Sequence, residues 1–188
     1  MVIMIRDDYN IERFEIDLSM DEILDNYINF EKTEKLCRKC RCHSNNWTCP
    51  PFDSNQIIVW ENYDNIKLIL LKFNFTNKAR QKQFDESEIM EYAFNLHHGE
   101  KTLIEPELKK LEKQLNGYYL TCGPCVNCKT CQRLTNGKCI MPEKRKYAME
   151  ALGANVIKLS KDFFHLDLQW IKNNTLPEYI IMMVSVLY

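Results

Sequence analysis

Apolar positions along the chain predict five strands. Residues 11–18 alternate loosely between apolar and polar side chains, which is typical of a half-buried strand. Residues 66–75 and 178–187 are almost continuously apolar, so we expect buried strands there. Shorter strands are predicted at 118–122 and 155–159.

Helix-start and helix-stop signals lie between these strands. Ser19, with Glu22 three residues later, is a capping box that predicts a helix to about residue 30. Ser54 is placed to cap a short helix ending near Tyr63. Asp85 with Glu88 begins another helix, which Gly99 is placed to stop.

Two further helices are expected in the second half of the chain. Pro106 stands at a first helical position, and Leu108, Leu111 and Leu115 then form one apolar face that Gly117 ends. Pro142 begins a helix over residues 143–152, closed by Gly153. Residues 161–171 are ambiguous between helix and strand.

Helices that alternate with single strands predict an α/β fold. No repeat, low-complexity tract or Pro/Ser-rich linker divides the 188 residues. We therefore expect a single domain over residues 1–188, with one mixed sheet flanked by helices and two cysteine-rich metal-binding loops. The 45% of hydrophobic residues are enough to build a core without metal.

All nine cysteines fall in two blocks. The second block reads C-x2-C-x2-C-x2-C-x7-C-x2-P, from Cys122 to Pro142. Three thiols at steps of three, with a remote fourth before a proline, resemble the way ferredoxin-type chains wrap an iron–sulfur cluster. A short loop broken by Gly and Pro can turn successive thiols toward one soft metal centre.

Five thiols are available for four positions in this block. Either the run Cys122–Cys131 supplies the ligands, or Cys125, Cys128, Cys131 and Cys139 do. We favour the second set, because it contains the remote cysteine and leaves Cys122 at the end of a strand. Zinc sites usually contain two C-x2-C pairs with a longer spacer, so the compact triplet favours [4Fe–4S] over the alternative, Zn²⁺.

The first block, Cys37, Cys40, Cys42 and Cys49, reads C-x2-C-x-C-x6-C. Four thiols leave three uses open: a four-thiolate zinc site, a second cluster, or an incomplete cluster with an open coordination position. Soft thiolates exclude magnesium and calcium. His43 lies inside this block and is the one histidine that we would test as a ligand or proton carrier.

Composition places the chain in a reducing compartment. Asp7 and Asp8 interrupt the apolar N-terminus where a secretory signal needs a continuous stretch, so we expect a cytoplasmic protein. The apolar run at 179–188 is about half the length that spans a bilayer. In the cytosol, metal binding or redox work is the expected use of cysteines rather than disulfides. The net charge of −1 argues against nucleic acid or an anionic membrane as the main partner.

Basic residues accompany both blocks. Arg38, Lys39 and Arg41 lie among the thiols of the first, and Lys144, Arg145 and Lys146 follow the second. Nearby cations balance the negative charge of thiolate clusters and raise their reduction potential. The chain has no Walker loop, no Gly-x-Gly-x-x-Gly and no Gly-x-Ser-x-Gly, so any chemistry belongs to the metal.

These segments together resemble the DUF2284 family of predicted metal-binding proteins. The resemblance runs through Cys37 and Cys40, the segment at 46–51 (Asn-Trp-Thr-Cys-Pro-Pro), the second block and residues 149–156. It implies that Cys37, Cys40 and Cys49 are ligands in the first block, with Cys125, Cys128, Cys131 and Cys139 in the second. Cys42 and Cys122 are additions to that pattern, and His43-Ser44 stands where similar members have Tyr-Gly.

The function expected from the sequence is that of an iron–sulfur protein that exchanges single electrons with a redox partner protein. One [4Fe–4S] cluster is expected in the second block, and the first block could hold another. Two alternatives stay open at this point. One is a structural zinc-binding adaptor, and the other is an enzyme or metal-delivery factor with an open position in the first block.

Overall fold

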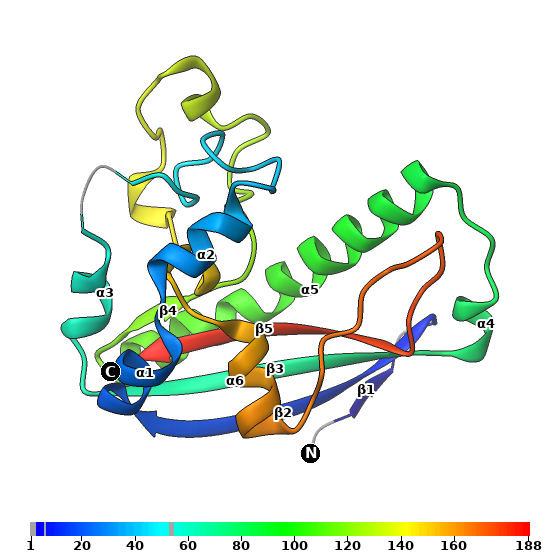
Figure 1. Cartoon of the computed structure of the whole chain (residues 1–188), viewed down its shortest axis with the longest axis horizontal. Helices are drawn as coiled ribbons and strands as arrows, with labels where there is room; N and C mark the ends of the chain where they lie inside the picture. Colours follow the sequence, from blue (N-terminus) through cyan, green and yellow to red (C-terminus); the bar gives the residue numbers. More distant parts are fainter. Residues whose placement is uncertain (1–2, 6, 53–54) are drawn as a thin grey trace.

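The computed structural model describes residues 3–5, 7–52 and 55–188. A five-stranded sheet with the order β1-β2-β3-β5-β4 runs through the molecule (Figure 1). Its strands are β1 (Ile3–Ile5), β2 (Tyr9–Ser19), β3 (Asn65–Phe75), β4 (Tyr118–Leu120) and β5 (Tyr179–Leu187). The longest ladder joins β2 to β3 in register from Tyr9↔Phe75 to Ser19↔Asn65.

Six α-helices and three 3-10 helices connect or cover these strands in the described chain. The α-helices are α1 (Met20–Tyr27), α2 (Phe30–Cys37), α3 (Ile57–Glu61), α4 (Asn77–Arg80), α5 (Glu86–Gln114) and α6 (Val156–Phe164). The 3-10 helices are η1 (Gln132–Thr135), η2 (Pro142–Lys144) and η3 (Glu150–Leu152). Within the described residues, no helix is both long and apolar enough to cross a membrane.

The predicted α/β fold, with one sheet flanked by helices, is confirmed, but the sheet is not mixed. Every ladder between the named strands is antiparallel. A parallel pair needs a connection that runs back along the whole sheet. Here β2 ends at Ser19 opposite Asn65, where β3 begins, so the long connection between them leaves and returns at one end. Strand and helix order alone cannot reveal this return.

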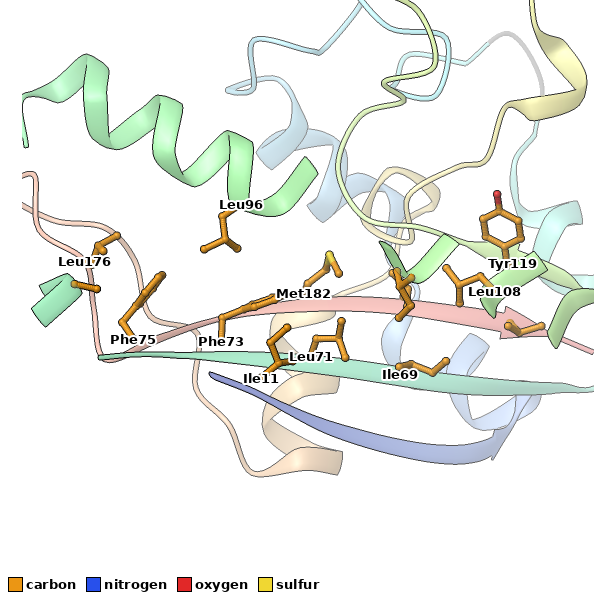
Figure 2. Close-up of a cluster of buried hydrophobic side chains, with 14 of the residues drawn as sticks. Ile11, Ile69, Leu71, Phe73, Phe75, Leu96, Leu108, Tyr119, Leu176 and Met182 are labelled. Atoms are coloured by element: carbon orange, nitrogen blue, oxygen red, sulfur yellow. The ribbon is translucent and has the colours of Figure 1, made fainter. Parts of the chain in front are cut away.

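Strand β3 lies at the centre of the fold because both of its faces are buried. Ile69, Leu71 and Phe73 belong to one core cluster, which α5 covers with Leu96 and Leu108 (Figure 2). The alternate residues of β3, Leu68 and Leu70 among them, belong to a second cluster on the opposite face. Helices α1, α3 and α6 supply the other side of that second cluster. Burial on both faces explains the continuous apolar run in the sequence.

Four of the five strand predictions, at 11–18, 66–75, 118–122 and 178–187, are confirmed by β2, β3, β4 and β5. The capping box at Asp85 and Glu88 is confirmed as well, since both reciprocal hydrogen bonds are present. Ser19 caps α1 by accepting the Glu22 N–H, but that helix ends at Tyr27. Asn29 then caps α2, which the sequence analysis did not predict.

Four other predictions were wrong. Gly99 does not stop a helix and Pro106 does not begin one, because both lie inside the 29-residue α5. Gly costs about 1 kcal/mol and Pro about 3 kcal/mol in a helix, and packing of the apolar face of α5 on the sheet offsets both. The region after Pro142 forms η2 and η3 rather than one helix, and residues 155–159 begin α6 rather than a strand. The predicted cap at Ser54 lies outside the described residues.

Two glycines give a matched test of the close contact between the turn after α5 and the end of β5. A Cβ atom on Gly117 would lie 2.0 Å from the carbonyl oxygen of Leu187, whereas one on Gly99 would meet nothing within 4 Å. We expect Gly117→Ala to lower the free energy of unfolding by about 2 kcal/mol through overpacking. Gly99→Ala should raise it by about 0.5–1 kcal/mol. Chemical denaturation of both variants checks this, and equal effects would contradict the close contact at Gly117.

Candidate metal centre

The two cysteine blocks lie side by side at one end of the molecule, outside the sheet (Figure 1). We refer to residues 37–51 and 122–142 as the cysteine lobe. Cys37 is the last residue of α2, and the chain then passes through short turns to Cys49. Strand β4 delivers the chain to Cys122 and the second block. All nine cysteines are free thiols.

Asn46 and Thr48 join the two blocks through the backbone of Cys125. The Asn46 side-chain amide donates to the Cys125 carbonyl at 2.9 Å, and the Cys125 N–H donates to Thr48 Oγ1 at 3.0 Å. Thr48 in turn donates its own N–H and hydroxyl to Asn46 Oδ1. Both side chains are buried, so their polar atoms need these partners. The arrangement fixes the second block directly against the first.

Arg133 and Trp47 make a second link between the blocks. The Arg133 guanidinium donates to the carbonyls of Asn46 (2.9 Å), Cys49 (2.5 Å) and Pro51 (2.5 Å). Its carbon Cζ lies 5.1 Å from the centroid of the Trp47 ring. The Trp47 indole N–H donates across to the Gly137 carbonyl at 3.0 Å. A single arginine therefore holds three carbonyls of the other block, which its planar array of donors suits.

Lys101 and Glu150 attach the second block to the rest of the fold. The Lys101 ammonium on α5 donates to the carbonyls of Cys122 (2.8 Å) and Pro124 (2.9 Å). A carboxylate oxygen of Glu150, at the start of η3, accepts the Gly123 N–H at 2.8 Å. Lys101 and Glu150 thus hold the start of the second block, residues 122–124, in position.

The four thiols of the first block line one cavity. Burial raises the pKa of Cys37 to about 11, with the carboxylates of Glu150 and Glu34 as the next causes. Burial, followed by the other three thiols of the block, raises the pKa of Cys49 to about 12. The backbone N–H of Cys42 donates to the sulfur of Cys40 at 3.4 Å. The four thiols are therefore close neighbours, with Cys37, Cys42 and Cys49 partly buried and Cys40 exposed.

The second block separates Cys122 from the other thiols. Cys122 packs against the core cluster under α5, and burial raises its pKa to about 12. The pKa of Cys125 is raised by burial and also by the thiols of Cys128 and Cys139. Cys125 is thus close to Cys128 and Cys139, two of the ligands that we favour. Cys122 instead faces the hydrophobic core under α5.

The donor set fits a soft metal. In the described part of the chain, no three His, Cys, Asp or Glu side chains already form a closed metal site. Protonated thiols have no reason to converge, whereas binding of a metal releases the protons and draws thiolates together. Thiolates select zinc or iron–sulfur clusters over magnesium and calcium. The residues that would hold the metal are therefore the thiols of each block.

Positive charge is concentrated around these thiols. Residues 122–146 contain six Lys or Arg and one Glu, and residues 32–51 contain five Lys or Arg and one Glu. The whole chain has a net charge of −1. The cysteine lobe and its flanks are thus strongly basic on an otherwise acidic molecule, which eases the accumulation of thiolate charge.

The histidines have structural partners. His43 Nε2 lies 2.9 Å from a Glu34 carboxylate oxygen and Nδ1 lies 3.1 Å from Ser44 Oγ, so both ring nitrogens are engaged. His97 lies within α5 rather than at a helix end, against the ring of Phe73. Its pKa is lowered by burial and then by Lys101.

Several residues that organise the site were missed by sequence reasoning. Arg133, Lys101 and Glu150 carry no ligand spacing, and α5 was expected to end before Lys101. Thr48 and Asn46 lay inside the segment that carried the family resemblance, which was the one available signal for them. Their role in joining the blocks becomes visible only in three dimensions.

The comparisons with known proteins agree with this chemistry. Residues 24–188 match the model of the DUF2284 family, described as predicted metal-binding protein. Comparison with curated proteins and with solved structures gives no match. The match spans nearly the whole chain, including both cysteine blocks and the residues that join them. The chain belongs to DUF2284, a family of predicted metal-binding proteins.

Proposed function

We propose that the protein binds a [4Fe–4S] cluster through Cys125, Cys128, Cys131 and Cys139 and exchanges single electrons with a redox partner protein. The observation that carries the proposal is the assembly of the cysteine lobe. Asn46 and Arg133 donate hydrogen bonds and Thr48 accepts one between two thiol-rich loops, and these bonds hold the loops together outside a sheet that has its own core. Such a lobe holds a cofactor near the surface, where a partner can reach it.

When bound, a cluster of this type supplies one-electron redox chemistry at a potential set by charge, hydrogen bonds and burial. The chain's own residues would tune that potential. Lys129, Lys138 and Lys144 place ammonium groups in and after the second block. Positive charge favours the more negative reduced state, so these lysines raise the potential.

The first block is proposed as a second metal site with Cys37, Cys40 and Cys49 as ligands. Cys42 is adjacent in space and completes a set of four thiols around one cavity. Three ligands would leave one coordination position facing the cavity, whereas four would close the site. Metal analysis tests this second site, because two occupied sites per chain contain more metal than one.

The basic surface indicates the chemistry of the partner. A redox protein with an acidic face around its own cofactor would be steered toward the cysteine lobe by long-range attraction. Such attraction is screened by salt, with a Debye length of about 10 Å at 0.1 M ionic strength. We expect the rate of electron exchange to fall as salt concentration rises.

Anaerobic purification followed by iron and acid-labile sulfide analysis tests the proposal. We expect about four iron and four sulfide per cluster, a brown protein, and an electron paramagnetic resonance signal after reduction with dithionite. Zinc without acid-labile sulfide would refute the cluster and favour a structural zinc protein, in which chelation unfolds the lobe because metal-binding energy is folding energy.

A further inference from the structure

A cavity of about 530 Å³ lies beside the first cysteine block. Its walls come from α2, both cysteine blocks, the segment that contains η3, and α6. Leu36 and Ile157 line it although 54% and 44% of their surfaces are exposed, so they stand where the cavity meets solvent. The volume is within the range of about 300–1,000 Å³ that is typical of small-molecule sites.

Small side chains create this space. Ala148, Ala151 and Ala154 follow one another at steps of three along the segment that contains η3, and all three line the cavity. Pro50 and Pro124 add apolar surface from the two cysteine blocks. Because these residues are buried or partly buried and apolar, the walls favour a ligand with an apolar body.

The charged groups of the cavity are distributed unevenly. Lys32, Lys158 and Lys161 line it with exposed side chains, and Glu150 is the carboxylate among the lining residues. Lys158 also donates to the Asn26 carbonyl at 3.1 Å, and Lys161 lies 3.5 Å from Asp167. Glu150 is fixed on the inner side by the Gly123 N–H. The opening is therefore cationic, and the inner wall holds a carboxylate and the thiols.

We propose that this cavity binds a small organic anion with an apolar body. The anionic group would lie at the opening, near Lys32 and Lys158, and the apolar body would fill the space left by the three alanines. The opposite orientation would take the anion away from these ammonium groups and toward the inner wall, where Glu150 is the lining carboxyl. The inner end of the ligand then lies beside Cys37 and Cys49, within reach of any metal that the first block holds.

This inference goes beyond electron transfer, because it gives the lobe a ligand of its own. A ligand whose inner end faces the first block is positioned either as a substrate or as an effector that alters access to the metal. The proposal rests on the cavity and its charges, and it holds whether the second block contains iron or zinc.

Titration of the anaerobically purified protein with straight-chain carboxylates tests it. Butanoate, hexanoate and octanoate are added in isothermal titration calorimetry, with octylammonium as the cation of matched length. We expect affinity to rise with chain length, and octanoate to bind at least about tenfold more tightly than octylammonium, a difference of about 1.4 kcal/mol. Lys32→Gln should weaken octanoate binding, most clearly at low salt.

A pair of isoleucine variants locates the binding site. Ile157→Asp places a carboxylate at the opening and should weaken octanoate at least about tenfold. Ile58→Asp is the matched control, since Ile58 is 54% exposed against 44% for Ile157 and does not line the cavity. Both positions tolerate a polar residue without loss of core packing, so folding is preserved in each.

Three outcomes would overturn the inference: no binding of any carboxylate, equal binding of octylammonium, or equal loss in both isoleucine variants. Metal content measured on the same samples separates this test from that of the proposed function. An iron-loaded protein that ignores carboxylates refutes the cavity ligand alone. A zinc-loaded protein that binds octanoate refutes the cluster alone.

Discussion

Replacing Cys139 with Ser should remove most of the metal from the second block or leave a degraded three-iron cluster. Cys139 is the remote thiol of the set, and it lies near enough to Cys125 to raise the pKa of the Cys125 thiol. A serine oxygen is a harder and less acidic ligand than a thiolate, so a soft cluster loses one of its four anchors. We expect the same loss for Cys125→Ser, Cys128→Ser and Cys131→Ser.

Cys122→Ser is the matched control for that panel. Its thiol packs against the core under α5 rather than toward the other thiols, so the full metal content should be retained. Some stability should be lost, because a hydroxyl replaces a buried thiol, and Cys122→Ala should lose less. Iron and sulfide per chain, measured without oxygen, give the readout. Full metal loss in Cys122→Ser with none in Cys139→Ser would replace our ligand set by the uninterrupted run Cys122–Cys131.

Cysteine-to-serine substitutions in the first block should differ in how much metal they remove. Cys37→Ser, Cys40→Ser and Cys49→Ser should each lower the metal content of that block. Cys42→Ser should matter less if three thiols hold the metal, and as much if four do. The same metal assay, applied to Cys42→Ser, therefore decides whether the first site has a coordination position open to the cavity.

The second large effect is expected from Arg133→Ala. This change removes three hydrogen bonds from a charged donor to the carbonyls of Asn46, Cys49 and Pro51. Charge-assisted bonds contribute about 1.5–3 kcal/mol each when buried. Arg133 is only partly buried, so we expect a total loss of about 3 kcal/mol. For a chain of this size that corresponds to a fall in Tm of about 6–12 °C.

Two controls make the Arg133 result specific. Arg133→Lys should rescue little, because one ammonium cannot satisfy three carbonyls in a plane. Arg38→Ala removes an exposed arginine whose partner, Glu34, lies 3.3 Å away in the same helical stretch, and it should change stability by about 0.5 kcal/mol or less. Hydrogen exchange should show that Arg133→Ala loosens residues 46–51. Unchanged protection there would contradict its role as the link between blocks.

The strands could be predicted from the sequence because their signal is local. The continuous apolar run that forms β3 is what a strand buried on both faces requires. The run that forms β5 gives the same signal. Strand direction could not be predicted, since it depends on where a connection returns. The continuity of α5 through Gly99 and Pro106 was missed for a similar reason. Contacts of Leu96, Ile104 and Leu108 with the sheet outweigh the local cost of those two residues.

The site could be predicted only where its chemistry is visible in the spacing of residues along the sequence. Thiols at steps of three are visible in the sequence, and so are the basic residues beside them. The cavity was not, because Ala148, Ala151 and Ala154 are unremarkable until the first block is folded over them. Arg133 shows the same limit, as its three acceptors lie more than 80 residues away.

The place of β5 in the sheet has a consequence for the order of folding. This strand lies between β3 and β4, yet it is translated after both cysteine blocks. β3 pairs with a strand that follows it by more than 100 residues, and contacts of such separation form slowly. Until β5 arrives, β4 has no neighbour in the sheet and cannot position Cys122 and the loop beyond it. The nascent chain therefore exposes its thiols before it can arrange them, and correct metal loading follows closure of the sheet.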